Sequence, residues 1–144
     1  MRSGLIVFVV VLLAGCGGSQ SVHYNVTPAL ECLQRTNSIR GGGGSKSILL
    51  LFASDDGVSA VESVFVSFGP ASASGNVATA VGIPSRKPSW TERRGDARVT
   101  GYGPYVPPIA KKHNITDAQA RSAAGKLGTG VRAAVDDCLQ KNER

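Results

Sequence analysis

The sequence predicts a small α+β domain, a single sandwich in which N- and C-terminal helices pack on a short sheet and are linked by a disulfide. Three observations carry this prediction. Apolar residues recur at helical spacing near the C-terminus, residues 47–53 form a short unbroken apolar run, and two cysteines stand near opposite ends of the domain. The chain has 144 residues and a formal net charge of +6, and this length fits one domain.

The first predicted helix starts at Thr27 and Pro28 and ends before the glycine run 41–44. Threonine suits the capping position, and proline suits the first helical position, where its missing N–H costs nothing. The apolar run 47–53 follows as a buried central strand. The apolar face of the first predicted helix consists of Ala29, Cys32 or Leu33, and Thr36.

Residues 58–68 fit two descriptions. Their apolar residues follow helical spacing, and Ser54-Asp55-Asp56 supplies a cap and first-turn acids for a helix. The apolar residues from 62 to 68 also alternate, as they do in a strand. We favour the helix and keep the strand as the alternative.

Two weaker strands and one clear helix complete the predicted order. Residues 77–83 form one strand candidate, and residues 97–102 form another, with Val99 and Tyr102 as inward-facing anchors. The last helix begins with a capping box over residues 116–119. Its apolar stripe consists of Ala120, Ala123 or Ala124, Leu127, Val131, Ala134 or Val135, and Cys138.

The N-terminus has the order of a secretory signal: a basic start, an apolar run over residues 5–13, and small residues before Cys16. The run is shorter than the roughly 20 residues that span a bilayer, and a buried N-terminal strand is the alternative. Leu13-Ala14-Gly15-Cys16 resembles the lipobox of bacterial lipoproteins. The resemblance covers residues 1–16. It implies that diacylglycerol is attached to the Cys16 thiol and that the signal peptide, residues 1–15, is cut off just before it.

The predicted mature protein is therefore exported and lipid-anchored to a bacterial membrane in the cell envelope. Two or more acyl chains hold a protein on a membrane that the protein itself does not span. Residues 16–26 are predicted to form a lipidated flexible tether, because small polar residues follow the lipid site. Residues 27–144 then make up the single domain.

The remaining cysteines, Cys32 and Cys138, are predicted to form a disulfide. Leftover cysteines usually pair in the oxidising compartments that exported proteins reach. This bridge would join the first and last helices, and closing so long a loop stabilises a fold by about 4–5 kcal/mol in the chain-entropy description. Two separately buried free thiols are the alternative.

The sequence predicts no catalytic, cofactor-binding or metal-binding constellation. Its two histidines are His23, in the tether, and His113, just ahead of the last helix; a Ser-His-Asp triad would have to use one of them. The adjacent carboxylates Asp55-Asp56 and Asp136-Asp137 point in different directions on a helix and make poor acid/base pairs. No cluster of ligand residues has metal-binding spacing.

Residues 84–108 combine most of the prolines with positive charge and aromatic rings, including the single tryptophan. Such a segment has the ingredients of a binding surface for an anionic envelope polymer, a lipid headgroup or a protein partner. The exported location disfavours nucleic acid, although the charge would permit it. The alternative is an ordinary long loop with its tryptophan packed on the domain. The candidate residues are Arg86, Lys87, Trp90, Arg93, Arg94, Tyr102 and Tyr105.

These observations favour a non-enzymatic binding or structural interaction module on the cell envelope. One alternative is an envelope hydrolase, which would need His113 beside a serine and a carboxylate in a pocket. The other is an accessory subunit of a membrane complex, which would need a large exposed apolar patch on the last helix or the sheet.

Overall fold

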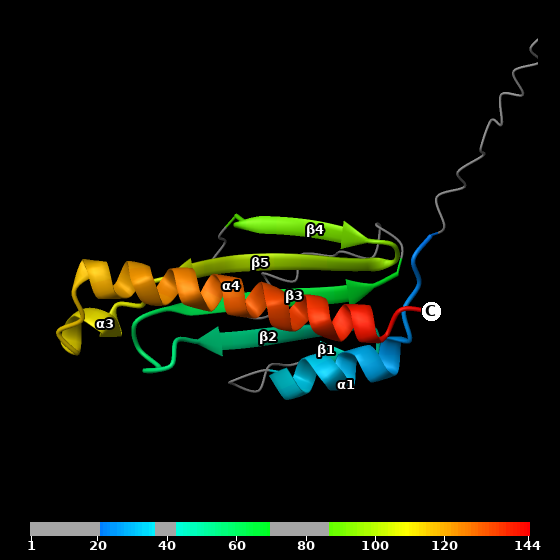
Figure 1. Ribbon diagram of the computed structural model, residues 1–144, viewed down its shortest axis with the longest axis horizontal. Helices are drawn as coiled ribbons and strands as arrows, with labels where there is room; N and C mark the ends of the chain where they lie inside the picture. Colours follow the sequence, from blue (N-terminus) through cyan, green and yellow to red (C-terminus); the bar gives the residue numbers. More distant parts are fainter. Residues whose placement is uncertain (1–20, 37–42, 70–86) are drawn as a thin grey trace, which may run out of the picture.

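The computed structural model describes residues 21–36, 43–69 and 87–144. The elements are α1 (Val26–Thr36), β1 (Gly43–Gly44), β2 (Ser47–Ala53), β3 (Val61–Phe68), β4 (Trp90–Arg94), β5 (Ala97–Tyr105), α3 (Ile109–Lys112) and α4 (Asp117–Lys141). The strands form one antiparallel sheet in the order β1-β2-β3-β5-β4, and α1 and α4 cover one of its faces (Figure 1). The predicted α+β fold is confirmed. The signal peptide, Cys16, the strand candidate 77–83 and Arg86 lie outside the described residues.

The sheet presents its apolar face to the helices. Strand residues alternate between the two faces, and the register places Leu50 opposite Val64 and Val66 opposite Val99 on the same face. These four side chains are buried in the core together with residues of both helices. The strand predicted at residues 47–53 has the bounds of β2 and is confirmed.

Helix α4 starts where the sequence predicts. Thr116 Oγ1 accepts a hydrogen bond from the backbone N–H of Gln119 at 3.2 Å, and the Gln119 side-chain oxygen accepts one from the backbone N–H of Thr116 at 2.9 Å. This reciprocal capping box satisfies two N–H groups that a helix start otherwise leaves unpaired. The buried residues of α4 are Ala120, Val131, Val135, Cys138 and Leu139.

The predicted disulfide between Cys32 and Cys138 is also confirmed, and it connects α1 with α4. The two Cα atoms lie 5.6 Å apart, a usual separation for a disulfide. Cys138 is fully buried, and Leu33 next to Cys32 lies in the same core. The bridge therefore fastens together the two helices that cover the sheet.

The prediction of a flexible tether over residues 16–26 is wrong for its last part. Tyr24 is 1% exposed, and its ring packs edge-on against Phe68 with the ring centroids 5.8 Å apart. The backbone N–H of Asn25 donates to the carbonyl of Asn142 at 2.9 Å, and α1 begins at Val26 rather than Thr27. The buried Tyr24 ring thus holds the end of the predicted tether against the domain, because burying this ring removes a large apolar surface from water.

The favoured helix over residues 58–68 is wrong, and the alternative strand is right. Residues 61–68 form β3, which pairs with β2 on one side and β5 on the other. A central strand needs two neighbours to satisfy its backbone, and these pairings outweigh the helical spacing of the apolar residues. The alternation of Val64, Val66 and Phe68 was therefore the informative pattern.

The acids expected to start that helix organise a tight loop instead. Asp56 Oδ1 accepts hydrogen bonds from the backbone N–H groups of Ser59 at 2.9 Å and Val58 at 3.0 Å, and from the Ser54 hydroxyl at 2.7 Å. The Ser59 hydroxyl donates to the other carboxylate oxygen. These bonds, led by the one from the Ser59 side chain, hold the pKa of Asp56 well below its usual range. The loop between β2 and β3 is therefore held in one conformation by an ionised carboxylate.

The strand predicted at residues 97–102 is confirmed as part of β5, but only one of its two anchors faces inward. Val99 is buried under the helices. Tyr102 lies three residues further on and pairs with Ser63, so it points to the opposite face and is half-buried there. Positions an odd number apart on one strand cannot share a face.

Candidate functional site

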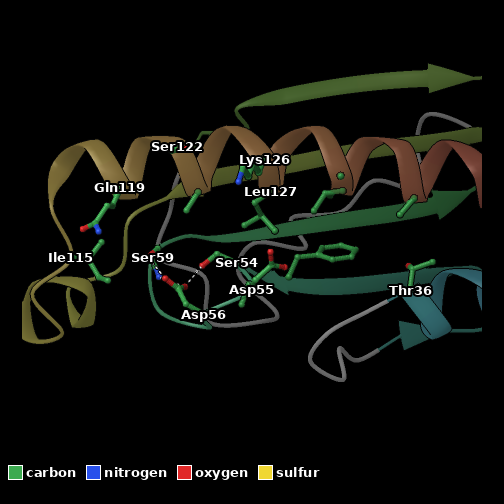
Figure 2. Close-up of a pocket in the computed structure, with 16 residues that line it drawn as sticks. Thr36, Ser54, Asp55, Asp56, Ser59, Ile115, Gln119, Ser122, Lys126 and Leu127 are labelled. Carbon is green, nitrogen blue, oxygen red and sulfur yellow. Dashed lines mark hydrogen bonds between the residues drawn. The ribbon is translucent and has the colours of Figure 1, made fainter.

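A groove lies between α4 and the end of β2 (Figure 2). Its volume is about 620 Å³. One wall is a stripe of α4, and the other is the end of β2 with the loop that leads to β3. Thr36, the last residue of α1, and Ile115, which precedes α4, also line it.

The α4 wall consists of side chains at helical three- and four-residue spacing, and half of them are small. This spacing places them on one face of the helix. At Gly130 nothing lies within 4 Å of the position that a Cβ atom would occupy. The helix therefore leaves space along the groove instead of filling it. The wall residues are Gln119, Ser122, Ala123, Lys126, Leu127, Gly130, Val131 and Ala134.

The opposite wall combines a buried ring with a polar rim. Phe52, which is 6% exposed, forms its apolar part. The loop held by Asp56 presents the exposed carboxylate of Asp55, and α4 presents the exposed ammonium of Lys126. Among the described residues, neither Asp55 nor Lys126 takes part in an ion pair. The groove thus combines apolar and polar lining residues, and Asp55 and Lys126 place two charges of opposite sign at its edge.

This groove has the size and lining of a small-molecule site. Such sites enclose about 300–1,000 Å³ and pair an apolar lining with a few placed polar groups. Within the described residues, no group of histidine, cysteine, aspartate or glutamate side chains could hold a metal ion. The arrangement can bind and orient a ligand, and two of the serine hydroxyls in its lining, those of Ser54 and Ser59, donate to the Asp56 carboxylate.

A second cluster lies on the other side of α4, around the buried carboxyl of Glu62. This residue is 1% exposed and faces the helix from β3. Its Oε1 accepts a hydrogen bond from the indole N–H of Trp90 at 3.0 Å, while its Oε2 is buried without a partner. The Arg132 guanidinium lies over the Trp90 ring, 4.4 Å from its centroid. Burial raises the pKa of Glu62, and the Trp90 hydrogen bond and the Arg132 charge oppose that rise.

The raised pKa makes the stability contributed by Glu62 depend on pH. Because the folded protein binds the Glu62 proton more tightly than the unfolded chain, this contribution is complete below the usual pKa of 4.5 and is lost as the pH rises through the raised value. As the pH rises through that range, the wild type should lose stability relative to Glu62→Gln, because the glutamine side chain stays neutral. Urea unfolding at a series of pH values measures the difference.

The exposed residue Glu31, on α1, offers a matched control. Glu31→Gln removes the same charge and should keep the wild-type dependence of stability on pH. A Glu62→Gln profile that ran parallel to the wild-type profile from pH 4 to pH 8 would show that Glu62 is not the group responsible.

The predicted binding surface over residues 84–108 is not one surface. Most of the segment is the hairpin of β4 and β5, and its side chains alternate between the two faces of the sheet. Trp90 and Arg94 point toward α4, whereas Arg93 and Tyr102 point away from it. Lys87 is exposed and Tyr105 is half-buried. These residues are close together in the sequence, but the alternation of side chains along each strand places them on opposite faces of the sheet.

Trp90 and Arg94 also have partners within the domain. Trp90 is half-buried between Glu62 and Arg132, which agrees with the alternative in which the tryptophan packs on the domain. The Arg94 guanidinium pairs with Glu92 at 2.8 Å and with Asp136 on α4 at 2.9 Å. These two side chains link β4 to α4 and are not free anchors for a partner.

The two alternative functions find little support in this geometry. His113 is exposed at the end of α3 and is not among the residues that line the groove. The exposed large apolar side chains of the described residues are Val106 and Ile109, near α3, and they do not form the large patch expected of a complex subunit. None of the described helices is long and apolar enough to cross a membrane.

Comparisons with known proteins leave the function open. No family model, curated protein or solved structure matches this chain.

The groove was missed in the sequence because three segments far apart in the chain form it. Glu62 could have been identified in the sequence as a buried charge, because it alternates with Val64, Val66 and Phe68 and therefore lies on the same apolar face of the strand. A charge at such a position is rarely fully buried unless it has a partner.

Proposed function

We propose that this protein is a lipid-anchored protein of the bacterial cell envelope that binds a small ligand with an apolar body. The observation that carries the proposal is the groove of about 620 Å³ between α4 and β2. Phe52, Leu127 and Val131 supply its apolar lining, and Asp55 and Lys126 supply charges at its edge. This combination of volume, lining and a few polar groups is typical of ligand sites.

The anchoring part of the proposal rests on the likeness of residues 13–16 to a lipobox. Cys16→Ser should abolish labelling of the protein by radioactive fatty acid in bacteria and should stop removal of the signal peptide. Both effects follow because the cysteine thiol is the atom that would carry the lipid and cleavage would follow its modification. Labelling that persists in Cys16→Ser would contradict the anchor, whatever the groove binds.

The binding part can be tested with two simple apolar probes, linear n-octanol and cyclic cyclohexanol. A ligand that binds the folded state raises the midpoint of thermal unfolding, because it removes folded protein from the unfolding equilibrium. We expect at least one probe to raise the midpoint of the wild type by several degrees, and Gly130→Phe to abolish the rise. A phenylalanine at this position would fill the open space beside the helix.

Gly125→Phe is the matched control. Gly125 lies on the same helix with equally open surroundings, but it does not line the groove. The control should respond to the probe as the wild type does. Equal responses in all three proteins, or no response to either probe, would contradict ligand binding in the groove.

A further inference from the structure

We infer that Ser21, His23 and Asp96 form a Ser-His-Asp triad in which Ser21 is an activated nucleophile toward carboxylic esters. The inference goes beyond the proposed function and does not depend on it, because none of these three residues lines the groove. The hydrolase considered above would use His113, whereas this triad uses the other histidine of the chain.

The side-chain atoms are paired in the way that such a triad requires. His23 Nδ1 lies 3.2 Å from Asp96 Oδ2, and His23 Nε2 lies 2.9 Å from Ser21 Oγ. When Nδ1 donates its proton to the carboxylate, the Nε2 lone pair accepts the proton of the serine hydroxyl. A nucleophile beside a base that a third group orients is the general signature of covalent catalysis.

The carboxylate of the triad is held in place by the turn between β4 and β5. The backbone N–H of Asp96 donates to the Val22 carbonyl at 3.1 Å, and the Asp96 carbonyl accepts from the Gly69 N–H at 2.8 Å. Gly95, with a φ of +55°, leaves no room for a Cβ atom beside the Val22 carbonyl. The backbone between Ser21 and His23 therefore lies directly on the turn that carries Asp96.

The imidazole is held in place by the C-terminus. At this end of the molecule the first described residues pass beside the end of the chain (Figure 1). The backbone N–H of Arg144 donates to the His23 carbonyl at 2.9 Å, and the next residue, Tyr24, is buried against Phe68. The fold thus fixes a base and a carboxylate from positions 73 residues apart. A base that is already oriented saves the entropy of positioning it during the reaction.

The expected reaction is acyl transfer from an ester to water in two steps. Ser21 Oγ attacks the ester carbonyl carbon, and its proton passes through His23 Nε2 to the oxygen of the leaving alcohol as the bond to that alcohol breaks. Water then attacks the acyl-serine with His23 again as the base, which releases the carboxylic acid and restores the hydroxyl. Because Ser21 and His23 are exposed, water solvates the charge that develops on the carbonyl oxygen. This setting favours esters with good leaving groups.

The test is covalent labelling of the full chain, purified from bacteria in detergent, with a fluorophosphonate. The serine oxygen bonds to phosphorus and fluoride leaves, so peptide mass spectrometry should find the label on Ser21. General-base assistance is worth about 10²–10⁴ in rate, and for an exposed triad we expect the lower end. His23→Asn should therefore slow the labelling of Ser21 about 100-fold, and Asp96→Asn should slow it as well.

His113→Asn is the matched control, since it removes an exposed histidine outside the triad. This variant should be labelled at the wild-type rate. Equal labelling of Ser21 in His23→Asn and in the wild type would overturn the inference, as would the absence of label from Ser21.

Ester turnover gives a second readout that a purely structural contact would not move. With p-nitrophenyl acetate, the wild type should release about one equivalent of p-nitrophenol in a burst before a slower steady rate, because the acyl-serine accumulates. Ser21→Ala removes an exposed hydroxyl and should abolish the burst. A burst that survives in Ser21→Ala would assign the reaction to another group and contradict the triad, whatever the groove binds.

Discussion

Removing the disulfide between Cys32 and Cys138 should lower the free energy of unfolding by about 4–5 kcal/mol, which is the expected contribution of a bridge that closes a loop of this length. The two cysteines are separated by 106 positions. The bridge ties α1 to α4, and within the domain α1 otherwise packs mainly against α4 and β2. Reduction therefore frees most of the chain in the unfolded state and loosens α1 in the folded state.

Urea unfolding with and without reductant measures this loss. Cys32→Ser and Cys138→Ser should each show the full loss without reductant, and the double variant should be insensitive to it. Cys138→Ser should be the less stable single variant, because Cys138 is completely buried whereas Cys32 is half-buried. Equal stability of the oxidised and reduced wild type would mean that the bridge does not restrict the unfolded chain.

The parts of the fold that local sequence describes were predictable. The capping box at Thr116 is a contact between residues three apart, and the apolar run over residues 47–53 is buried on both sides of its strand. The disulfide followed from the predicted export and from counting the cysteines. None of these required knowledge of which elements are neighbours in space.

The mispredicted parts all depended on neighbours. Residues 61–68 are a strand because β2 and β5 pair with them, and Tyr24 is buried because Phe68 offers it a surface. The candidate residues of segment 84–108 were expected on one surface, and they are divided between two faces for the same reason. The segment contains a hairpin, so adjacent residues such as Arg93 and Arg94 point to opposite faces. A groove built from α4, β2 and a loop is likewise a property of packing.

Gly101→Ala should lower the free energy of unfolding by about 3 kcal/mol, at the lower end of the cost of losing a packed aromatic side chain. Trp90 lies directly across Gly101 in the paired strands. A Cβ atom built on Gly101 would stand 2.1 Å from the indole nitrogen and from a neighbouring ring carbon. No side chain tolerates such an approach, so the whole indole must move.

Displacing the indole also affects Glu62. The hydrogen bond from Trp90 is the one that the Glu62 carboxyl receives, and its other oxygen already lacks a partner. Without that bond Glu62 is left buried and unsatisfied, which costs more than the bond itself contributed. Arg132 loses the ring on which it lies. One added methyl group therefore disrupts the contact between β4, β3 and α4.

Circular dichroism during urea unfolding measures the loss, and because Trp90 is the single tryptophan, its emission should shift to longer wavelength in folded Gly101→Ala. The thermodynamic cycle with Trp90→Ala is decisive. In that background the ring is gone, so Gly101→Ala should cost only a few tenths of a kcal/mol. As a control, Gly125→Ala on α4 meets open space and should raise stability by up to about 1 kcal/mol. If Gly101→Ala cost the same with and without the indole, the loss would come from the strand backbone, and Trp90 would not be what requires glycine at this position.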